Sequence, residues 1–100
     1  MVYQIKNYSF DKARREGVVI FPSTNKLKKI DVFKNGRKVA SIGGIRKNGI
    51  PYNDYPTYKK TIGRTKADKK RQAYLKRHAH EKDIKNKEYT PSYYAKKILW

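Results

Sequence analysis

"KKIDVFKNGRKVASIGG", residues 28–44, is the stretch with the clearest structural signal in this sequence. Asn35-Gly36 separates two runs that favour β-strands, and this dipeptide is the preferred centre of a type I′ turn. We therefore predict a β-hairpin that ends at Gly43-Gly44. A two-residue loop sets the cross-strand pairs as Val32 with Val39, Phe33 with Lys38, and Lys34 with Arg37. The last pair brings two cations together, which is mildly unfavourable.

The residues before the hairpin predict one more short strand and an N-terminal arm. Residues 17–23, GVVIFPS, form a β-branched run that Pro22 stops, because proline lacks the N–H that a strand donates. Residues 1–16 begin with alternating side chains, as in a short strand or extended arm, and Asp11 to Glu16 has room for one helical turn. We expect β-structure over residues 17–44, with residues 1–16 as the arm.

Residues 45–64 are rich in Gly, Pro, Asn and Tyr, a composition typical of loops. We predict a loop that contains one turn of helix after Asp54, with Pro56 near the start of that turn. Tyr52, Tyr55 and Tyr58 are spaced three apart and would share one face.

Residues 65–100 are predicted to be helical, in two helices. The first covers residues 66–83, KADKKRQAYLKRHAHEKD, and Thr65 with Asp68 has the spacing of a capping box. Its apolar stripe is narrow and interrupted by charge. We therefore expect this helix to dock through Tyr74 and Leu75.

The chain ends with the second predicted helix and three large apolar residues, Ile98-Leu99-Trp100. Thr90 is a suitable N-cap, because Pro91 follows at the first helical position. Chain ends are normally frayed and polar, so this end is expected to lie in a pocket of its own chain or of a neighbour. The residues predicted to anchor a partner are Tyr74, Leu75, Tyr93, Tyr94, Ile98, Leu99 and Trp100.

These elements predict one small α+β domain over residues 1–100, with a short sheet followed by two C-terminal helices. Hydrophobic residues make up 37% of the chain and charged residues 34%, and the net charge is +18. A chain of this length buries only a modest core, and self-repulsion at high net charge opposes compaction. We therefore expect the fold to be partly extended and stabilised by a partner.

The composition excludes several classes of function. The absence of cysteine excludes a disulfide scaffold, a thiolate zinc site and a cysteine nucleophile. No apolar run reaches the roughly 18 residues of a membrane span, and the first residues lack an export signal. His78 and His80 would face different sides of a helix without an evident third ligand. No catalytic or phosphate-loop motif is present, so we expect no enzymatic activity and no cofactor.

Positive charge is concentrated in residues 59–87, which contain twelve Lys and Arg against three acidic residues. Cations along one phosphate track would bind nucleic acid by counterion release, with little sequence preference, and tyrosines could stack on unpaired bases. The alternatives are a solvated basic face and a contact with an acidic protein surface. The predicted basic surface consists of Lys66, Lys69, Lys70, Arg71, Lys76 and Arg77.

Four stretches follow one another along residues 18–100: NGRKVASIGG, YNDYPTY, KADKKRQAYLKRH and PSYYAKKILW. In this order they resemble a family of small basic proteins encoded by large DNA viruses of algae and protists, including the chlorella viruses. Lys70 stands where the family has arginine, a change that preserves charge. The most specific parts of the resemblance are Lys70, Arg71, Tyr74, Arg77, His78 and the terminal Ile98-Leu99-Trp100.

The resemblance implies a structural virion protein, made in the host cytoplasm or viral factory. The role expected first is a minor capsid component that contacts major and other minor capsid proteins through its basic and aromatic residues. The alternative is a nonspecific nucleic-acid-binding protein that packages viral DNA. DNA binding would depend steeply on salt, whereas a capsid component would stay with shells after the genome is removed.

Overall fold

The predicted hairpin forms two of the three strands of an antiparallel sheet in the computed structural model, which describes residues 3–100. Asn35 and Gly36 have φ angles of 53° and 78°, the left-handed values that a type I′ turn requires. The α+β class and this hairpin are therefore confirmed. The sheet order is β1 (Val19–Pro22), β2 (Lys28–Lys34) and β3 (Arg37–Gly44), and the pairs Phe33–Lys38 and Lys34–Arg37 form as predicted.

The predicted pairing of Val32 with Val39 is wrong. Val32 lies opposite Ala40, because a register shift places one extra residue of β3 beside the turn. The shift brings Ile42 opposite Ile30, and both side chains are buried. A slip of one residue would send Ile42 to the opposite face of the sheet, so burial of the apolar side chains accounts for the bulge.

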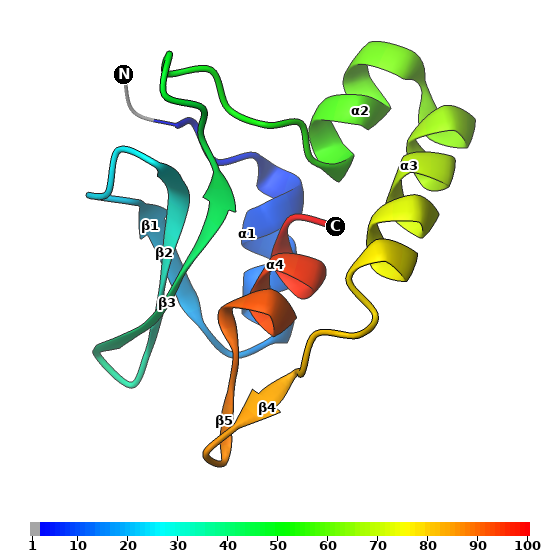
Figure 1. The fold of residues 1–100 in the computed structure, drawn as a ribbon. Helices are drawn as coiled ribbons and strands as arrows, with labels where there is room; N and C mark the ends of the chain where they lie inside the picture. The colour runs from blue at the N-terminus through cyan, green and yellow to red at the C-terminus, as the bar shows by residue number, and fades with distance from the viewer. Residues whose placement is uncertain (1–2) are drawn as a thin grey trace.

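Helices cover one face of the sheet (Figure 1). Within residues 3–100 they are α1 (Asn7–Arg15), α2 (Tyr55–Ile62), α3 (Arg64–Arg77) and α4 (Pro91–Ile98). α1 and α4 pack against each other and against the sheet, and α2 and α3 form a helical pair on the far side of α4. One hydrophobic core joins them, with residues from Tyr3 to Trp100.

The N-terminal segment is a docked helix rather than an arm with a single helical turn. α1 begins at Asn7 and buries two small side chains, Ser9 and Ala13. The Ser9 hydroxyl donates a hydrogen bond to the backbone oxygen of Ile98 (3.0 Å), which fixes α1 against α4. No side chain caps the first turn of α1, so the usual start signal is missing from the sequence. A short strand or an extended arm is predicted for the beginning of the chain; residues 3–6 do not form the strand, and Met1 and Val2 lie outside the described residues.

The segment predicted as a tyrosine-rich loop contains two turns of helix. Asp54 caps α2 by accepting a hydrogen bond from the backbone N–H of Thr57 (3.2 Å), and Gly63 ends the helix with a φ of 86°. α3 follows directly after Gly63, without a side-chain cap. The predicted capping box of Thr65 and Asp68 is therefore wrong. The carboxylate of Asp68 instead accepts a hydrogen bond from the Tyr55 hydroxyl (2.7 Å).

The two predicted helices of residues 65–100 are separated by more than a short connection. α3 ends at Arg77, six residues before the predicted end. A second hairpin follows, with β4 (Ile84–Lys85) paired to β5 (Glu88–Tyr89) through a turn in which Asn86 and Lys87 have φ angles of 53° and 66°. The predicted start of the last helix is confirmed, because the Thr90 hydroxyl accepts a hydrogen bond from the N–H of Tyr93 (3.2 Å).

The chain is compact. Its radius of gyration is 13.2 Å, close to the roughly 13 Å expected for a globular chain of 100 residues. The prediction of a partly extended chain is therefore wrong for residues 3–100. The physical reason is that aromatic and aliphatic residues from both ends of the chain pack together in a single core.

Candidate functional site

The residues predicted to anchor a partner mostly pack inside this chain. Tyr94, Ile98, Leu99 and Trp100 are all buried in the core, and Ile98 is 0% exposed. The ring of Tyr74 stacks on the ring of Trp100 with 4.2 Å between centroids and an interplanar angle of 10°. The pocket predicted for the chain end is thus formed by the chain itself. The prediction that these side chains contact a neighbour is corrected accordingly.

The other two predicted anchors are half-buried. Leu75 and Tyr93 line, together with Lys12, a hollow where α1, α3 and α4 meet. The Tyr93 ring stacks on Tyr89 at 3.9 Å, and its hydroxyl donates a hydrogen bond to the carboxylate of Glu16. The contacts of Tyr93 join α4 to β5 and to the end of α1 within one molecule, whereas Leu75 lies at the surface of the hollow.

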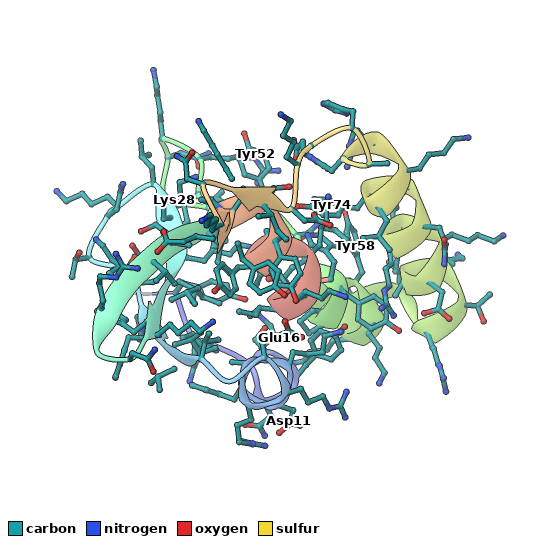
Figure 2. The ribbon with its side chains drawn as sticks, turned by 90° about the horizontal axis from the view of Figure 1, so that it is seen from below. Asp11, Glu16, Lys28, Tyr52, Tyr58 and Tyr74 are labelled. Atoms are coloured by element: carbon teal, nitrogen blue, oxygen red, sulfur yellow. The ribbon has the colours of Figure 1, made fainter. Side chains whose placement is uncertain are left out.

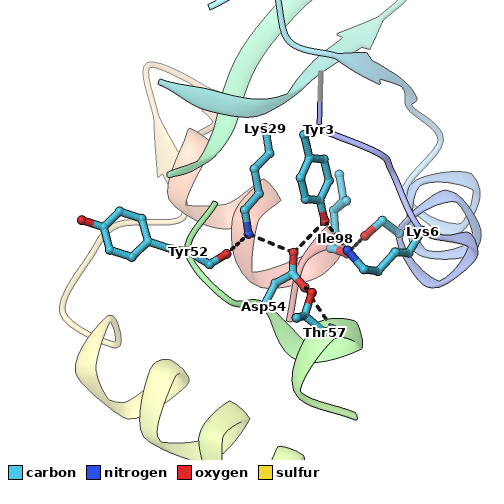
Figure 3. A network of polar contacts seen from close by, with 8 residues as sticks. Tyr3, Lys6, Lys29, Tyr52, Asp54, Thr57 and Ile98 are labelled. Atoms are coloured by element: carbon cyan, nitrogen blue, oxygen red, sulfur yellow. Dashed lines mark hydrogen bonds and ion pairs between the residues drawn. The ribbon is translucent and has the colours of Figure 1, made fainter. Parts of the chain in front are cut away.

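A buried polar network fixes the start of α2 against the sheet (Figure 3). The Lys29 ammonium lies 2.9 Å from the Asp54 carboxylate, and both side chains are at most 2% exposed. The Tyr3 hydroxyl donates to the same carboxylate oxygen (2.7 Å), and the Thr57 hydroxyl donates to the other oxygen (2.7 Å). Lys29 also donates to the backbone oxygen of Tyr52.

The electrostatics of this network indicate a structural role. Burial alone would raise the pKa of the Asp54 carboxyl, but the Lys29 charge and the hydrogen bonds from Thr57, Lys29 and Tyr3 lower it below its usual value. A carboxylate and an ammonium held in this way are both satisfied and sealed from solvent. At no more than 2% exposure, the pair is placed to hold the start of α2 against the sheet, and we expect it to stabilise the fold.

The predicted cations of α3 lie on its outer face. At 100° per residue, five of them fall within an arc of about 120°, opposite the stripe in which Ala67 is buried and Tyr74 is half-buried. All five are exposed. We refer to them as the α3 basic face: Lys66, Lys69, Lys70, Lys76 and Arg77. Arg71 is not part of it, because it is half-buried with its guanidinium 5.5 Å from the ring centroid of Tyr55.

No carboxylate in the described part of the chain neutralises the α3 basic face. Four of the 26 Lys and Arg side chains lie within 4.0 Å of a carboxylate, and the other 22 do not. The eight carboxylates already have partners within the fold. Those partners include Arg14 for Asp11, Tyr93 for Glu16, Ser41 for Asp31, Lys29 for Asp54, Tyr55 for Asp68, His78 for Glu81, Lys96 for Asp83 and Arg37 for Glu88.

The helix dipole adds to this excess of positive charge. The first turn of α3 has no acidic residue and contains Arg64 and Lys66. Cations at a helix N-terminus are unfavourable by about 0.3–1 kcal/mol each. Lys59 and Lys60 at the end of α2 add two further charges close in sequence to this turn. The α2–α3 pair is therefore a basic surface on which no Lys or Arg lies within 4.0 Å of a carboxylate of the described residues.

The two histidines do not form a metal site with other described residues. Nδ1 of His78 lies 2.8 Å from the carboxylate of Glu81, which also accepts a hydrogen bond from Ser92. His80 is exposed. Within residues 3–100 no group of three His, Cys, Asp or Glu side chains is placed to hold a metal ion.

Comparisons with known protein families, with curated proteins and with solved structures find no match to this chain. The resemblance to viral proteins thus remains an expectation from the sequence. In the part of the chain that the structure describes, no helix is long and apolar enough to cross a membrane.

Proposed function

We propose that the protein binds nucleic acid without sequence specificity, through the α3 basic face. The observation that carries this proposal is five exposed cations on one side of a helix, none of them within 4.0 Å of a carboxylate in residues 3–100. Phosphates can neutralise such an array, and the release of their condensed counterions drives binding. The aromatic residues that would have supported a protein-anchoring role are instead packed inside the fold.

The spacing of the α3 basic face suits a charged backbone. Lys66, Lys69 and Lys70 lie in the first half of the helix, and Lys76 and Arg77 lie at its end. At 1.5 Å per residue the two groups are separated by roughly 10 Å along the helix axis. The two groups can thus contact phosphates at different positions along one backbone, with one phosphate for each cation. Nothing in this arrangement reads base identity, so the proposed binding is nonspecific.

Neutralising part of this face is expected to weaken nucleic-acid binding and its salt dependence. Each lost phosphate contact lowers the slope of log Kobs against log[salt] by about 0.9 for duplex DNA. The triple variant K66Q/K69Q/K70Q should therefore lose close to three units of slope. The measurement is fluorescence anisotropy of a labelled 30-base-pair duplex over a series of salt concentrations.

A matched control removes three exposed lysines that lie outside α2 and α3. The variant K26Q/K47Q/K85Q changes the net charge by the same amount. If binding depends on the α3 basic face, this control keeps most of the wild-type slope. Equal losses in the two triple variants would show that net charge alone is responsible, and the proposed interface would be wrong.

A second candidate is the minor capsid role that the family resemblance implies, in a virion assembled in the host cell. The observation that favours it is the outer face of the edge strand β1, where Val19 and Phe21 are 57% and 53% exposed. Phe21 packs edge-on against Phe33 (5.6 Å between centroids), and Ile20 faces the core. An exposed apolar edge can pair with another protein. Retention of the protein at fixed stoichiometry in shells emptied of genome would support this role over nucleic-acid binding.

A further inference from the structure

A cleft of about 690 Å³ lies between β3 and α3, with α4 contributing to its lining. Figure 2 shows Lys28 on the sheet side and Tyr74 on the α3 side of the molecule. The volume is within the range of sites that hold small organic ligands. The charged side chains in its lining are Lys28, Lys29, Arg77 and Glu81, and the aromatic ones are Tyr52, Tyr74, His78 and Trp100.

Aromatic side chains line the cleft from two sides. On the α3 side the ring of Tyr74 stacks on Trp100 with 4.2 Å between centroids, and the ring of His78 lies 4.3 Å from Tyr74 at an angle of 35°. His78 is half-buried and lines the cleft. Tyr52, from the segment after β3, lines the cleft as well and is 52% exposed. Flat, partly exposed rings of this kind offer stacking surfaces to a planar ligand.

Tyr52 is held in position although it is exposed. The guanidinium of Arg46 lies 4.4 Å from the centroid of its ring. Gly44 lies against the ring edge, and a Cβ at that position would come within 2.8 Å of a ring carbon. The ring is thus fixed by contacts on its own side of the cleft before any ligand binds.

The cleft contains cations that can bind the phosphates of a nucleotide and a carboxylate that can bind its base. Lys28 and Arg77 line the cleft and supply positive charge for phosphate. Glu81 also lines it, and hydrogen bonds from Ser92 and His78 hold the pKa of its carboxyl below the usual value. The Glu81 carboxylate repels phosphate and can accept a hydrogen bond from the amino group of a base. Arg77 also belongs to the α3 basic face, so the cleft and that face share a side chain.

We infer that the cleft binds an unpaired base of single-stranded nucleic acid, with the flanking phosphates on Lys28 and Arg77 and the strand continuing along the α3 basic face. This inference rests on the proposed nucleic-acid binding and adds to it the preferred form, single-stranded rather than duplex. Stacking of one base on an aromatic side chain contributes roughly 5- to 150-fold in affinity. A paired base in a duplex cannot enter the cleft.

The test compares a labelled single-stranded 20-mer with the duplex of the same sequence, at 0.15 M salt. The wild-type protein should bind the single strand at least about 5-fold more tightly. Y52A should lose about 10-fold for the single strand and keep its duplex affinity within about 2-fold. Y89A is the matched control, because Tyr89 is also exposed (42%) but lies on β5 outside the cleft.

Two adjacent cations allow binding in the cleft to be distinguished from general electrostatic attraction. Arg77 lines the cleft and Lys76 does not, although both are exposed in the last turn of α3. R77Q should lower single-strand affinity more than duplex affinity, whereas K76Q should lower both equally. Trp100 is the only tryptophan, and its fluorescence should change with the single strand and not with the duplex.

The results can contradict base binding in the cleft without contradicting nucleic-acid binding by the α3 basic face. If single strand and duplex bind equally, or if Y52A binds the single strand as Y89A does, the inference about the cleft is wrong and binding by the α3 basic face stands. Identical behaviour of R77Q and K76Q overturns the cleft in the same way. Failure to bind either nucleic acid overturns both the cleft and the proposed function.

Discussion

Deletion of Ile98–Trp100 is expected to abolish cooperative unfolding of the isolated protein. Ile98 and Leu99 are at most 1% exposed, and Trp100 is stacked on Tyr74. Truncating a buried Ile or Leu to Ala costs about 2–5 kcal/mol, and a buried Trp about 3–5 kcal/mol. Domains of this size are stable by only about 5–15 kcal/mol, so loss of all three side chains removes most or all of the stability.

Urea denaturation followed by circular dichroism, with no partner present, measures this effect. Single substitutions grade it: I98A should lower the free energy of unfolding by about 2–5 kcal/mol and I98V by about 0.5–1.5 kcal/mol. I50A is the control, because Ile50 is 54% exposed and surface changes stay within about 0.5 kcal/mol. A truncated protein with an unchanged denaturation midpoint would place the chain end outside the core and return it to the role of a partner anchor.

The second large effect is expected for Asp54→Asn, which should destabilise the protein by about 3–5 kcal/mol. Asparagine can still cap α2, but it leaves the ammonium of Lys29 buried without a counter-charge. Lys29→Met should also destabilise the protein, because it leaves the carboxylate of Asp54 buried without a counter-charge. The double variant K29M/D54N should lose much less than the sum of the single variants, because neither charge is then left alone. The free energies of unfolding of the four proteins give this coupling directly.

The same network predicts how stability depends on pH. The pKa of Asp54 is lower in the folded state than the usual value of about 3.9. Its contribution is therefore complete above about pH 5 and is lost as the pH falls through the folded-state value. As the pH is lowered below about 5, the free energy of unfolding should fall less steeply for D54N than for the wild type.

An exposed ion pair provides the contrast for this experiment. Arg37 and Glu88 are 68% and 62% exposed, and the same type of double-variant cycle at this pair should give a coupling within about 1 kcal/mol. If the Lys29–Asp54 cycle gives a value as small, the buried network does not stabilise the fold in the way described.

A chain with a net charge of +18 must offset the repulsion among its cations to stay folded. The core formed by both chain ends and the sealed network around Asp54 supply stability from within. We expect the repulsion among the remaining cations to weaken the fold without preventing it. A bound polyanion would relieve that repulsion, so binding and stabilisation are linked.

The sequence alone was sufficient for features that depend on neighbouring residues. The hairpin at Asn35-Gly36 follows from a turn that needs two left-handed residues, and the start of α4 follows from the cap at Thr90. The outward direction of the α3 cations follows from the helical repeat once Ala67 and Tyr74 are taken as the inner side. All of these depend on spacings of a few residues, which are visible in a single sequence.

Only the tertiary structure decided the features that join distant parts of the chain. Ser9 contacts Ile98 across 89 residues, and Tyr3 reaches Asp54 across 51. Because these contacts leave no periodic pattern, the sequence predicts only one turn of α1 and does not indicate the role of Asp54 in the core. The burial of Trp100 in its own chain and the meeting of Tyr52 with Tyr74 in one cleft depend in the same way on how helices and sheet pack. Local chemistry determines which elements form, and the competition for a single small core determines which residues remain on the surface to bind a partner.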